Sequence, residues 1–368
     1  MGKNILFLTP HVPSQRAGGE NFTRQLLEHL SKNNKIDLLY FRYSEDPLYI
    51  CPNSNIKIVK EIVNSTSLKL KNFILRPYFH PIFSIRFNWF VLKFLRNLVK
   101  RNNYDLIYLD HSQMALYGKY FPNIKKIYMS HDVMIQRFSR RGNFIVSNLI
   151  KKAEGNLMKQ PNTYVFTFSD KDKKIISDVY GIDSYVTNFF LDKNVINAKP
   201  TNLTNSIIFF GKWKRADNFD GLKWFFENVY GNLSQELSIK IIGKWLPADF
   251  IRKIKDFPNV EYLGFVDNPY DIISNSLAVI SPLFSGAGVK VKVVESLACG
   301  TPVIGNEIAF EGISKDFSSF MIKAHSPQEY IDKINSLNFS LTDRQQYKDN
   351  FIRRYQKESI INFIETIE

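Results

Sequence analysis

The segment FSGAGVKVKVVESLACGTPVIG, residues 284–305, decides how the rest of the chain is interpreted, because it predicts a loop, a helix and a strand in immediate succession. Gly286 and Gly288 lie in the loop, residues 289–298 have the spacing of a helix, and residues 301–304 form a short apolar run typical of a buried strand. A glycine-rich loop that leads into a helix allows a ligand to approach the backbone closely.

Two lysines of this segment indicate the kind of ligand. Lys290 and Lys292 fall in the first turn of the predicted helix, where free N–H groups and the macrodipole already create a positive potential. Cations are unfavourable at that end unless an anion binds there, and helix N-termini bind phosphate groups readily. The segment therefore indicates a phosphate site. The alternative is an ordinary exposed helix start in which Lys292 pairs with Glu295, three residues later.

Strands and helices are predicted in regular alternation on both sides of a polar stretch at residues 192–205. The first half begins with a strand, a loop, a helix and a strand, which is the order of a βαβ unit in a parallel sheet. Its strands are predicted at 4–8, 36–41, 56–59, 105–109, 126–130 and 163–168, and its helices at 20–30, 84–100, 143–159 and 170–180. The second half has predicted strands at 206–210, 238–242, 260–263, 277–281 and 301–304, a helix at 218–229, and one or two closing helices at 343–368.

We therefore predict an α/β protein with two Rossmann-like, doubly wound domains facing across a cleft. The N-terminal domain spans residues 1–190 and is completed by a C-terminal helix at 350–368, and the second domain spans residues 191–349. Open α/β sheets bind ligands at the carboxyl ends of their strands. We expect the loop with Gly18 and Gly19 and the phosphate site to lie at such ends.

The composition excludes several classes of protein. Lys and Arg outnumber Asp and Glu by 49 to 35, and 44% of the residues are hydrophobic, which suits folded domains with a basic surface. Two distant cysteines, Cys51 and Cys299, argue against a disulfide framework or a zinc site and favour a reducing compartment. The N-terminus does not resemble a signal peptide, and no apolar run reaches the roughly 18 residues of a membrane-spanning helix. These features predict a cytoplasmic protein.

The stretch from Ile62 to Tyr104 is basic and aromatic, and it contains no acidic residue. Arg86, Lys93 and Lys100 are seven residues apart and would share one face of a helix, with aromatic residues beside them. A basic amphipathic helix with exposed aromatic side chains is typical of the surface of an anionic membrane, here the inner face of the cytoplasmic membrane. The alternative is a helix packed on the sheet with a solvated charged face. No module for nucleic-acid binding accompanies the charge, so we expect no nucleic-acid partner.

His131 and a basic loop are further candidates for chemistry. His131 follows a predicted strand in the sequence KIYMSHD, where it would act as a hydrogen-bond partner or a general acid/base, or simply hold a loop. Lys212 begins the loop KWKR after another strand, and together with Lys290 it would clamp a diphosphate. Glu295 is suited to accept hydrogen bonds from a neutral diol such as a ribose. The sequence has no motif for a P-loop or for a metal site.

Several motifs together resemble the donor-binding domain of retaining glycosyltransferases of the GT-B fold, family 4. The matching sequences are IIFFGKWKRADNFDGLKWF, IKIIGKW, VEYLGFVDN, SPLFSGAGVKVKVVESLACGTPVIG and AFEGI, all within residues 207–313. The first half is similar more loosely, through LTPHVPSQRAGGE, SHD and FSD.

The resemblance implies sugar transfer from a nucleotide diphosphate sugar to a glycan or lipid-linked acceptor, with retention, without a metal ion or other cofactor, in cell-surface polysaccharide biosynthesis. It assigns the diphosphate to Gly288, Val289, Lys290 and Lys212, and the ribose to Glu295. It further implies the following roles: Phe265 and Val266 beside the base, Gly19 near the donor phosphate, and His131 at the transferred sugar.

Two departures from the family pattern affect sugar recognition. Many members have a glutamate eight positions before the ribose glutamate, where this chain has Ala287. Asp217 and Asn218 stand where a second lysine is usual, so that Lys214 or Arg215 would substitute. Two alternatives remain open: a nucleotide-sugar 2-epimerase of the same fold, which would need further acidic and histidine residues around its sugar, and a non-catalytic nucleotide- or glycan-binding subunit.

Overall fold

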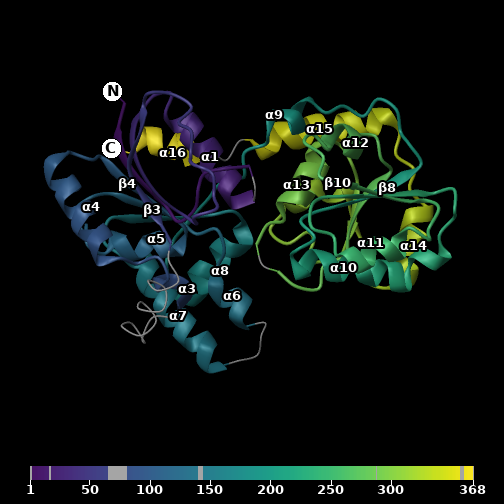
Figure 1. Ribbon diagram of the computed structural model, residues 1–368, viewed down its shortest axis with the longest axis horizontal. Helices are drawn as coiled ribbons and strands as arrows, with labels where there is room; N and C mark the ends of the chain where they lie inside the picture. The colour runs from purple at the N-terminus through teal and green to yellow at the C-terminus, as the bar shows by residue number, and fades with distance from the viewer. Residues whose placement is uncertain are drawn as a thin grey trace. The chain divides into compact units, whose positions relative to one another are not determined.

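The computed structural model describes residues 2–15, 18–64, 81–139, 144–286, 288–356 and 360–367 of the chain. Contacts within the chain divide it into two compact units. Unit 1 comprises Met1–Phe190 together with Glu358–Glu368, and unit 2 comprises Leu191–Lys357. Each unit is a parallel β-sheet with helices on both faces (Figure 1).

Unit 1 contains a parallel sheet with the strand order β3-β2-β1-β4-β5-β6-β7. Its strands are β1 (Asn4–Thr9), β2 (Lys35–Arg42), β3 (Ile56–Val63), β4 (Leu106–Asp110), β5 (Lys126–Met129), β6 (Thr163–Thr167) and β7 (Tyr185–Val186). The central strands β1, β4 and β5 are almost continuously buried, as expected for strands covered on both faces. The order reverses between β1 and β4, which places a topological switch point at the carboxyl ends of these two strands.

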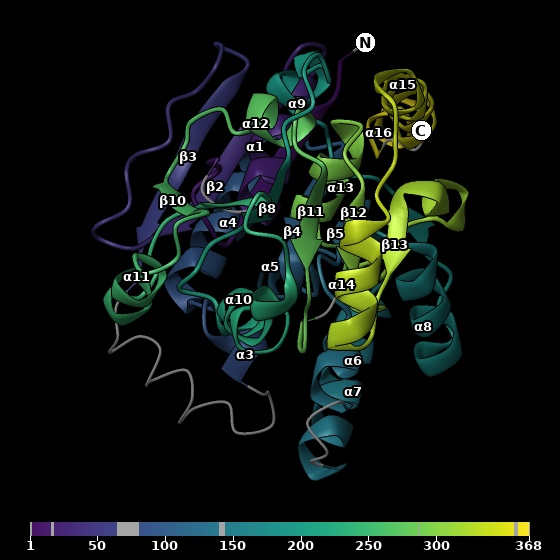
Figure 2. The ribbon, with the colours of Figure 1, turned by 90° about the vertical axis from the view of Figure 1, so that its right-hand side faces the viewer.

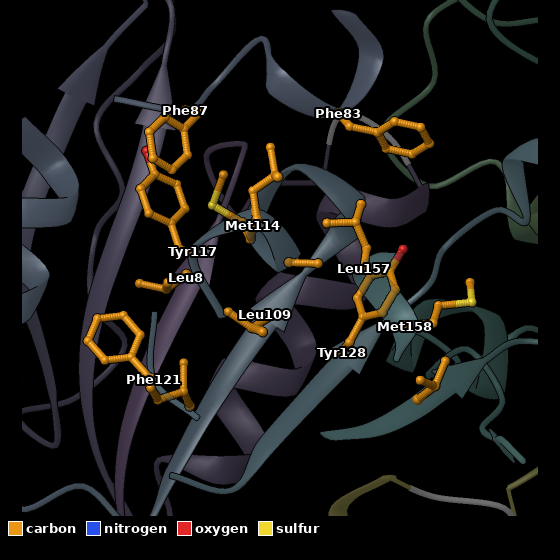
Figure 3. Packing of buried hydrophobic residues seen from close by; sticks show 14 of the residues in the cluster. Leu8, Phe83, Phe87, Leu109, Met114, Tyr117, Phe121, Tyr128, Leu157 and Met158 are labelled. Atoms are coloured by element: carbon orange, nitrogen blue, oxygen red, sulfur yellow. The ribbon is translucent and has the colours of Figure 1, made fainter. Parts of the chain in front are cut away.

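The helices of unit 1 form a layer on each face of the sheet. They are α1 (Gly18–Leu30), α3 (Pro81–Ser84), α4 (Trp89–Arg101), α5 (His111–Gly118), α6 (Met134–Ser139), α7 (Phe144–Met158), α8 (Asp170–Tyr180) and the C-terminal α16 (Ile360–Thr366). Helices α1 and α16 pack together on one face. Helices α5 and α7 lie on the other, where Tyr117 and Leu157 pack against Leu8, Leu109 and Tyr128 of the strands (Figure 3).

Unit 2 contains a second parallel sheet with the order β10-β9-β8-β11-β12-β13 (Figure 2). Its strands are β8 (Ser206–Phe210), β9 (Ser238–Ile242), β10 (Val260–Gly264), β11 (Ala278–Ser281), β12 (Val303–Gly305) and β13 (Met321–Lys323). Its helices are α9 (Lys193–Asn197), α10 (Ala216–Asn228), η1 (Tyr230–Asn232), α11 (Ala248–Ile254), α12 (Tyr270–Ser274), α13 (Val291–Ala298), η2 (Lys315–Phe320), α14 (Pro327–Asn335) and α15 (Leu341–Tyr355). Helices α10, α11 and α14 cover one face, and α9, α12, α13 and α15 the other.

The prediction of two Rossmann-like α/β domains is confirmed, and the strands from β1 to β6 and from β8 to β12 lie close to their predicted positions. The short edge strands β7 and β13 were not predicted, because two or three residues carry too little periodicity. The boundary between the units lies at Phe190 and Leu191, α15 belongs to unit 2, and only α16 returns to unit 1.

The predicted helix at 84–100 was wrong at its start. The side chain of Asn88 accepts a hydrogen bond from the N–H of Phe90 and caps α4, so the helix begins at Trp89. Arg86 and Phe87 therefore lie before the helix and are buried, instead of lining an exposed stripe with Lys93 and Lys100. Residues 65–80 of the same basic stretch lie outside the described residues. Among the helices that the structure describes, none is long and apolar enough to cross a membrane.

Candidate functional site

The switch point of unit 1 is built around a buried carboxylate. Asp110 is the last residue of β4 and is 1% exposed. Its Oδ2 accepts hydrogen bonds from the hydroxyls of Thr9 and Thr23, both at 2.8 Å, and its Oδ1 lies 2.7 Å from Nε2 of His131. Burial alone would raise the pKa of Asp110, but the neighbouring His111 and His131 and the hydrogen bonds outweigh burial and hold it well below its usual range. Asp110 therefore remains ionised and orients His131.

His131 follows β5 and presents its other ring nitrogen towards helix α1. Because Nε2 bonds to the ionised Asp110, the bond assigns a proton to Nε2, and in the neutral ring Nδ1 is then an acceptor. A Cβ placed on Gly19 would lie 3.1 Å from this Nδ1 and 3.5 Å from Cε1 of His111. A glycine at position 19 therefore lets α1 begin directly against the two imidazoles.

Two further histidines complete this cluster, and sequence analysis did not identify either. The ring of His111 stacks on that of His131 at 3.5 Å between centroids, and His11 meets His111 edge-on at 5.3 Å. His111 has a φ of 63°, a strained backbone conformation for a residue other than glycine. Burial lowers the pKa of His11 to about 4 and that of His111 well below 6.5, so both rings are neutral at pH 7. The available signal was the pair Asp110–His111 at the end of a buried strand.

The same cluster contains the one arrangement of metal-ligating side chains found among the described residues. Ligand atoms of Asp110, His111 and His131 lie within 4.8 Å of one another. Both oxygens of Asp110, however, already accept hydrogen bonds from protein groups. A metal would have to displace these bonds, so the geometry favours a hydrogen-bonding site over a metal centre.

In unit 2, the glycine-rich loop and the start of α13 lie after β11, at the carboxyl edge of the sheet. Gly286 and Gly288 have φ values of 119° and 69°, which other residues rarely adopt, so the predicted loop glycines are required by its shape. Lys290 is the N-cap of α13 rather than part of its first turn. Its Nζ donates a 2.6 Å hydrogen bond to the carbonyl of Gly288 and lies 3.6 Å from Oε2 of the buried Glu311. The lysine is thus held at the N-terminus of α13, where its own side chain does not cap the helix amides.

Lys292 is directed towards helix α10 instead of towards Glu295. Its Nζ donates a 2.8 Å hydrogen bond to Oδ1 of Asn218. Burial lowers the pKa of Lys292 to about 8, Asp217 opposes this shift, and the positive charges of Arg215 and Lys290 add to it. The alternative pairing with Glu295 is therefore wrong. The structure brings cations from the basic loop and from the α13 start close enough to influence one another.

Glu295 lies one turn further along α13. Burial raises its pKa to about 7, a hydrogen bond from Tyr270 of α12 opposes the shift, and the charge of Asp192 adds to it. Its carboxyl group therefore changes charge near neutral pH. Sequence analysis did not identify Tyr270 or Glu311 as partners, although the glutamate stands in the quoted motif AFEGI.

The loops after β8, β9 and β10 pair lysines with aromatic rings. Nζ of Lys212 lies 4.7 Å from the ring centroid of Trp245, and Nζ of Lys244 lies 3.8 Å from that of Phe265. Both aromatic side chains are more than half exposed, and Trp245 has a φ of 65°. Val266 is half-buried beside Phe265. Trp245 was not singled out, although it ends the motif IKIIGKW.

The two positions where the sequence departs from the family pattern have different outcomes in the structure. Arg215 donates two hydrogen bonds to Asp217, at 3.0 and 2.6 Å, and is exposed, so its own neighbour already occupies it. Ala287, the position where the family pattern has a glutamate, lies outside the described residues.

Comparison with solved structures shows the class of fold. The chain superposes on HepE of Anabaena in complex with UDP with a TM-score of 0.68 at 14% identity, covering 98% of this chain and 97% of that one. It also superposes on a TarM mutant of S. aureus in complex with Fondaparinux, α-GlcNAc-glycerol and UDP, with a TM-score of 0.68 at 13% identity and coverage of 99% and 98%. Sucrose-phosphate synthase from Thermosynechococcus elongatus gives 0.65 at 12%, with coverage of 98% and 96%. The fold is that of the GT-B glycosyltransferases.

A family model gives the more particular assignment. Residues 204–338 match the family described as glycosyl transferases group 1, so the chain carries a domain of this kind in unit 2. This range contains the basic loop, both aromatic loops and the α13 start. No curated protein matches the sequence significantly.

Proposed function

We propose that the protein is a retaining glycosyltransferase of family 4 that transfers a sugar from a nucleotide diphosphate sugar to a glycan or lipid-linked acceptor, without a metal ion. The observation that carries the proposal is the start of α13, where Lys290 and Lys292 gather beside free helix amides within the group 1 domain. Cations gathered at a helix N-terminus are suited to a diphosphate.

Each group at this edge has a part in donor binding. The amides of Gly288 and Val289 and the ammonium groups of Lys290 and Lys212 bind the diphosphate, which competes with Glu311 for Lys290. Glu295 accepts hydrogen bonds from the ribose, and Phe265 and Val266 lie beside the base. HepE and TarM were solved with UDP, which supports a uridine nucleotide as the first to test.

The chemistry depends on leaving-group stabilisation. The C1–O bond between sugar and diphosphate breaks, the acceptor hydroxyl bonds to C1 on the same face, and the departing phosphate takes the hydroxyl proton. The cations of unit 2 stabilise the charge that develops on the leaving diphosphate. His131, oriented by Asp110, accepts a hydrogen bond from a hydroxyl of the transferred sugar at Nδ1.

The acceptor is expected at the inner face of the cytoplasmic membrane, in cell-surface polysaccharide biosynthesis. Helix α4 supports this placement, because its exposed face carries Trp89 (57% exposed) and Phe90 (82% exposed) together with cations and no acidic residue. The exposed cations of this face are Lys93, Arg96, Lys100 and Arg101. Aromatic rings beside cations suit an anionic lipid surface.

Sedimentation with vesicles tests this placement. Anionic phosphatidylglycerol vesicles should retain the protein, neutral phosphatidylcholine vesicles should retain less, and the double variant Trp89→Ser/Phe90→Ser should lose the difference. Phe265→Ser, which removes an aromatic side chain of similar exposure from unit 2, is the matched control. Equal absence of binding to both vesicle types would count against the membrane surface.

A 2-epimerase is the second candidate, and one observation favours it. The structure gathers His11, His111 and His131 around Asp110, a set of titratable groups that the sequence alone did not connect. A panel of nucleotide sugars, with and without glycan acceptors, separates the two functions. We expect acceptor-dependent release of nucleotide diphosphate with the sugar on the acceptor. A rearranged nucleotide sugar without transfer would support the epimerase, and tight nucleotide binding without turnover would support a binding subunit.

A further inference from the structure

Arg86 occupies an unusual place in unit 1, in the short connection between α3 and α4. The hydroxyl of the buried Tyr117 donates a 2.8 Å hydrogen bond to the carbonyl of Arg86 and accepts one at 2.9 Å from the N–H of Asn88. The ring of Tyr117 also stacks on Phe87 at 5.1 Å. The backbone from the carbonyl of Arg86 to the N–H of Asn88 is therefore anchored to α5.

The guanidinium group of Arg86 is buried and only partly bonded. The residue is 5% exposed, and its charge lies 5.9 and 5.6 Å from the ring centroids of Phe41 and Tyr43, at the carboxyl end of β2. Among the residues that the structure describes, its Nε and Nη1 have no hydrogen-bond partner. Within the described residues, no carboxylate forms an ion pair with it. Burial lowers the pKa of Arg86, while Tyr43 and the charges of Asp46 and Glu20 oppose the shift.

A buried cation with two unused donors is costly unless a ligand completes it. An arginine side chain remains charged even when its pKa falls, and its parallel N–H groups match the two oxygens of a carboxylate or phosphate. The aromatic rings beneath the guanidinium explain its orientation, but they do not satisfy Nε–H and Nη1–H. The arrangement is that of an oxyanion site.

This site belongs to the same sheet edge as the histidine cluster. After burial, the charge of Arg86 is the largest influence that lowers the pKa of His11, and it also lowers that of His111. This effect places the guanidinium on the side of His11 and His111, and the ring of His111 stacks on that of His131. A ligand bound to Arg86 would therefore have its neutral part close to His131.

We propose that Arg86 binds an oxyanion of the acceptor, so that the sugar is transferred to a glycan or lipid-linked substrate bearing a carboxylate or phosphate near the reacting hydroxyl. The proposal rests on the proposed function, and it adds the charge of the acceptor. The donor diphosphate has its own cations at the α13 start in unit 2. The oxyanion accepts a hydrogen bond from Nε–H or from Nη1–H, which lack partners among the described residues and point to different sides of the guanidinium.

Matched acceptor pairs test the proposal in the full-length protein. Each pair consists of a neutral sugar acceptor and the same sugar with a phosphate or a uronic acid carboxylate, used with the donor identified in the nucleotide-sugar panel. We expect a preference in kcat/KM of roughly 10- to 100-fold for one charged form, the range expected for hydrogen bonds to a charged group. The preferred member of the series distinguishes phosphate from carboxylate.

Two variants assign the preference to Arg86. Arg86→Met should remove it, and Arg86→Lys should retain only part of it, while nucleotide binding and slow donor hydrolysis remain as in the wild type. Arg353→Met, which removes an exposed arginine of α15 in unit 2, should keep the full preference. If the protein turns over its donor but uses neutral and charged acceptors equally, the inference about Arg86 is wrong, and the proposed glycosyltransferase function is unaffected.

A binding measurement covers the case in which Arg86→Met does not fold. The Nε resonance of Arg86 in the isotope-labelled wild type, assigned with Arg86→Lys, should shift on titration with inorganic phosphate or acetate. A resonance unchanged by both anions would overturn the proposal. If no donor is turned over but the resonance shifts, the glycosyltransferase function fails and the oxyanion site remains.

Discussion

The two sheets have the same architecture, but their carboxyl edges use opposite electrostatics. In unit 1, one buried carboxylate, Asp110, is surrounded by hydroxyls and by two histidines that are neutral at pH 7. In unit 2, Lys290 and Lys292 crowd the start of α13 and are only partly balanced by Glu311 and Asp217. The first edge is suited to orienting hydroxyl groups, and the second to holding an anion. The contrast shows that similar strand–loop–helix units acquire different roles from a few residues at the strand ends.

The largest effect on activity is expected from the removal of His131, which tests whether the two sheet edges have separate roles. His131→Ala should lower sugar transfer by roughly 10²- to 10⁴-fold, the usual contribution of a positioned acid–base group, and should leave nucleotide affinity unchanged. His325→Ala, which removes a half-exposed histidine from unit 2, is the control. Steady-state kinetics and calorimetric nucleotide titration give the two values. A parallel loss of nucleotide affinity would mean that the two edges do not have separate roles.

Substitution of Asp110 should lower the stability of the protein more than the other substitutions considered. Asp110→Asn should lower the free energy of unfolding by about 3 kcal/mol, because it breaks a buried charged network. The folded-state pKa of Asp110 lies below its unfolded value, so its stabilisation is present above the unfolded pKa and is lost as the pH falls through the folded pKa.

Urea unfolding between pH 3 and pH 7 checks both statements. The difference between wild type and Asp110→Asn should be largest near pH 7 and should shrink at acid pH. A difference independent of pH would show that packing, not the charge of Asp110, holds this edge together.

Lys290→Ala tests whether the carboxyl edge of unit 2 binds the diphosphate. Loss of its charged hydrogen bonds should weaken binding of the nucleotide diphosphate by roughly 10- to 100-fold. Lys253→Ala, which removes an exposed lysine of α11 in the same unit, should change affinity by less than about threefold. Equal affinity of Lys290→Ala and wild type in calorimetry would show that the diphosphate clamp is misassigned.

The smallest effect expected is a pH dependence of donor affinity, which arises from titrating groups of unit 2. Below a pH of about 7, Glu295 gains a proton and binds the ribose less well, and above about 8, Lys292 loses its charge. Affinity for the intact nucleotide sugar, whose diphosphate does not titrate in this range, should therefore be greatest between these values and fall roughly three- to tenfold per pH unit on either side.

Variants assign the two limbs of this profile. Glu295→Gln should flatten the acid limb, and Lys292→Arg should flatten the alkaline limb because arginine remains charged. His11 and His111 of unit 1, which are neutral at pH 7, predict no comparable step for nucleotide binding. A profile unchanged in both variants would assign the titration to other groups.

Much of the fold was predictable from the sequence, because buried parallel strands and amphipathic helices carry regular patterns over many residues. The glycine loop, Lys290 and Glu295 were identified for the same reason, since they lie within one continuous segment. The start of α4 was missed because one capping residue, Asn88, decides it. His111, His11 and Tyr270 were missed because their roles depend on partners distant in the sequence.

The sequence alone therefore determined the two α/β domains, and it predicts an anion site in the segment at residues 284–305. Only the tertiary structure decided which side chains share a site. It stacked His111 on His131 across two strand ends, directed Lys292 to Asn218 instead of Glu295, and buried Arg86 beside Phe41 and Tyr43. Periodic burial is a local property of the chain, whereas these contacts arise from the order in which the strands pair.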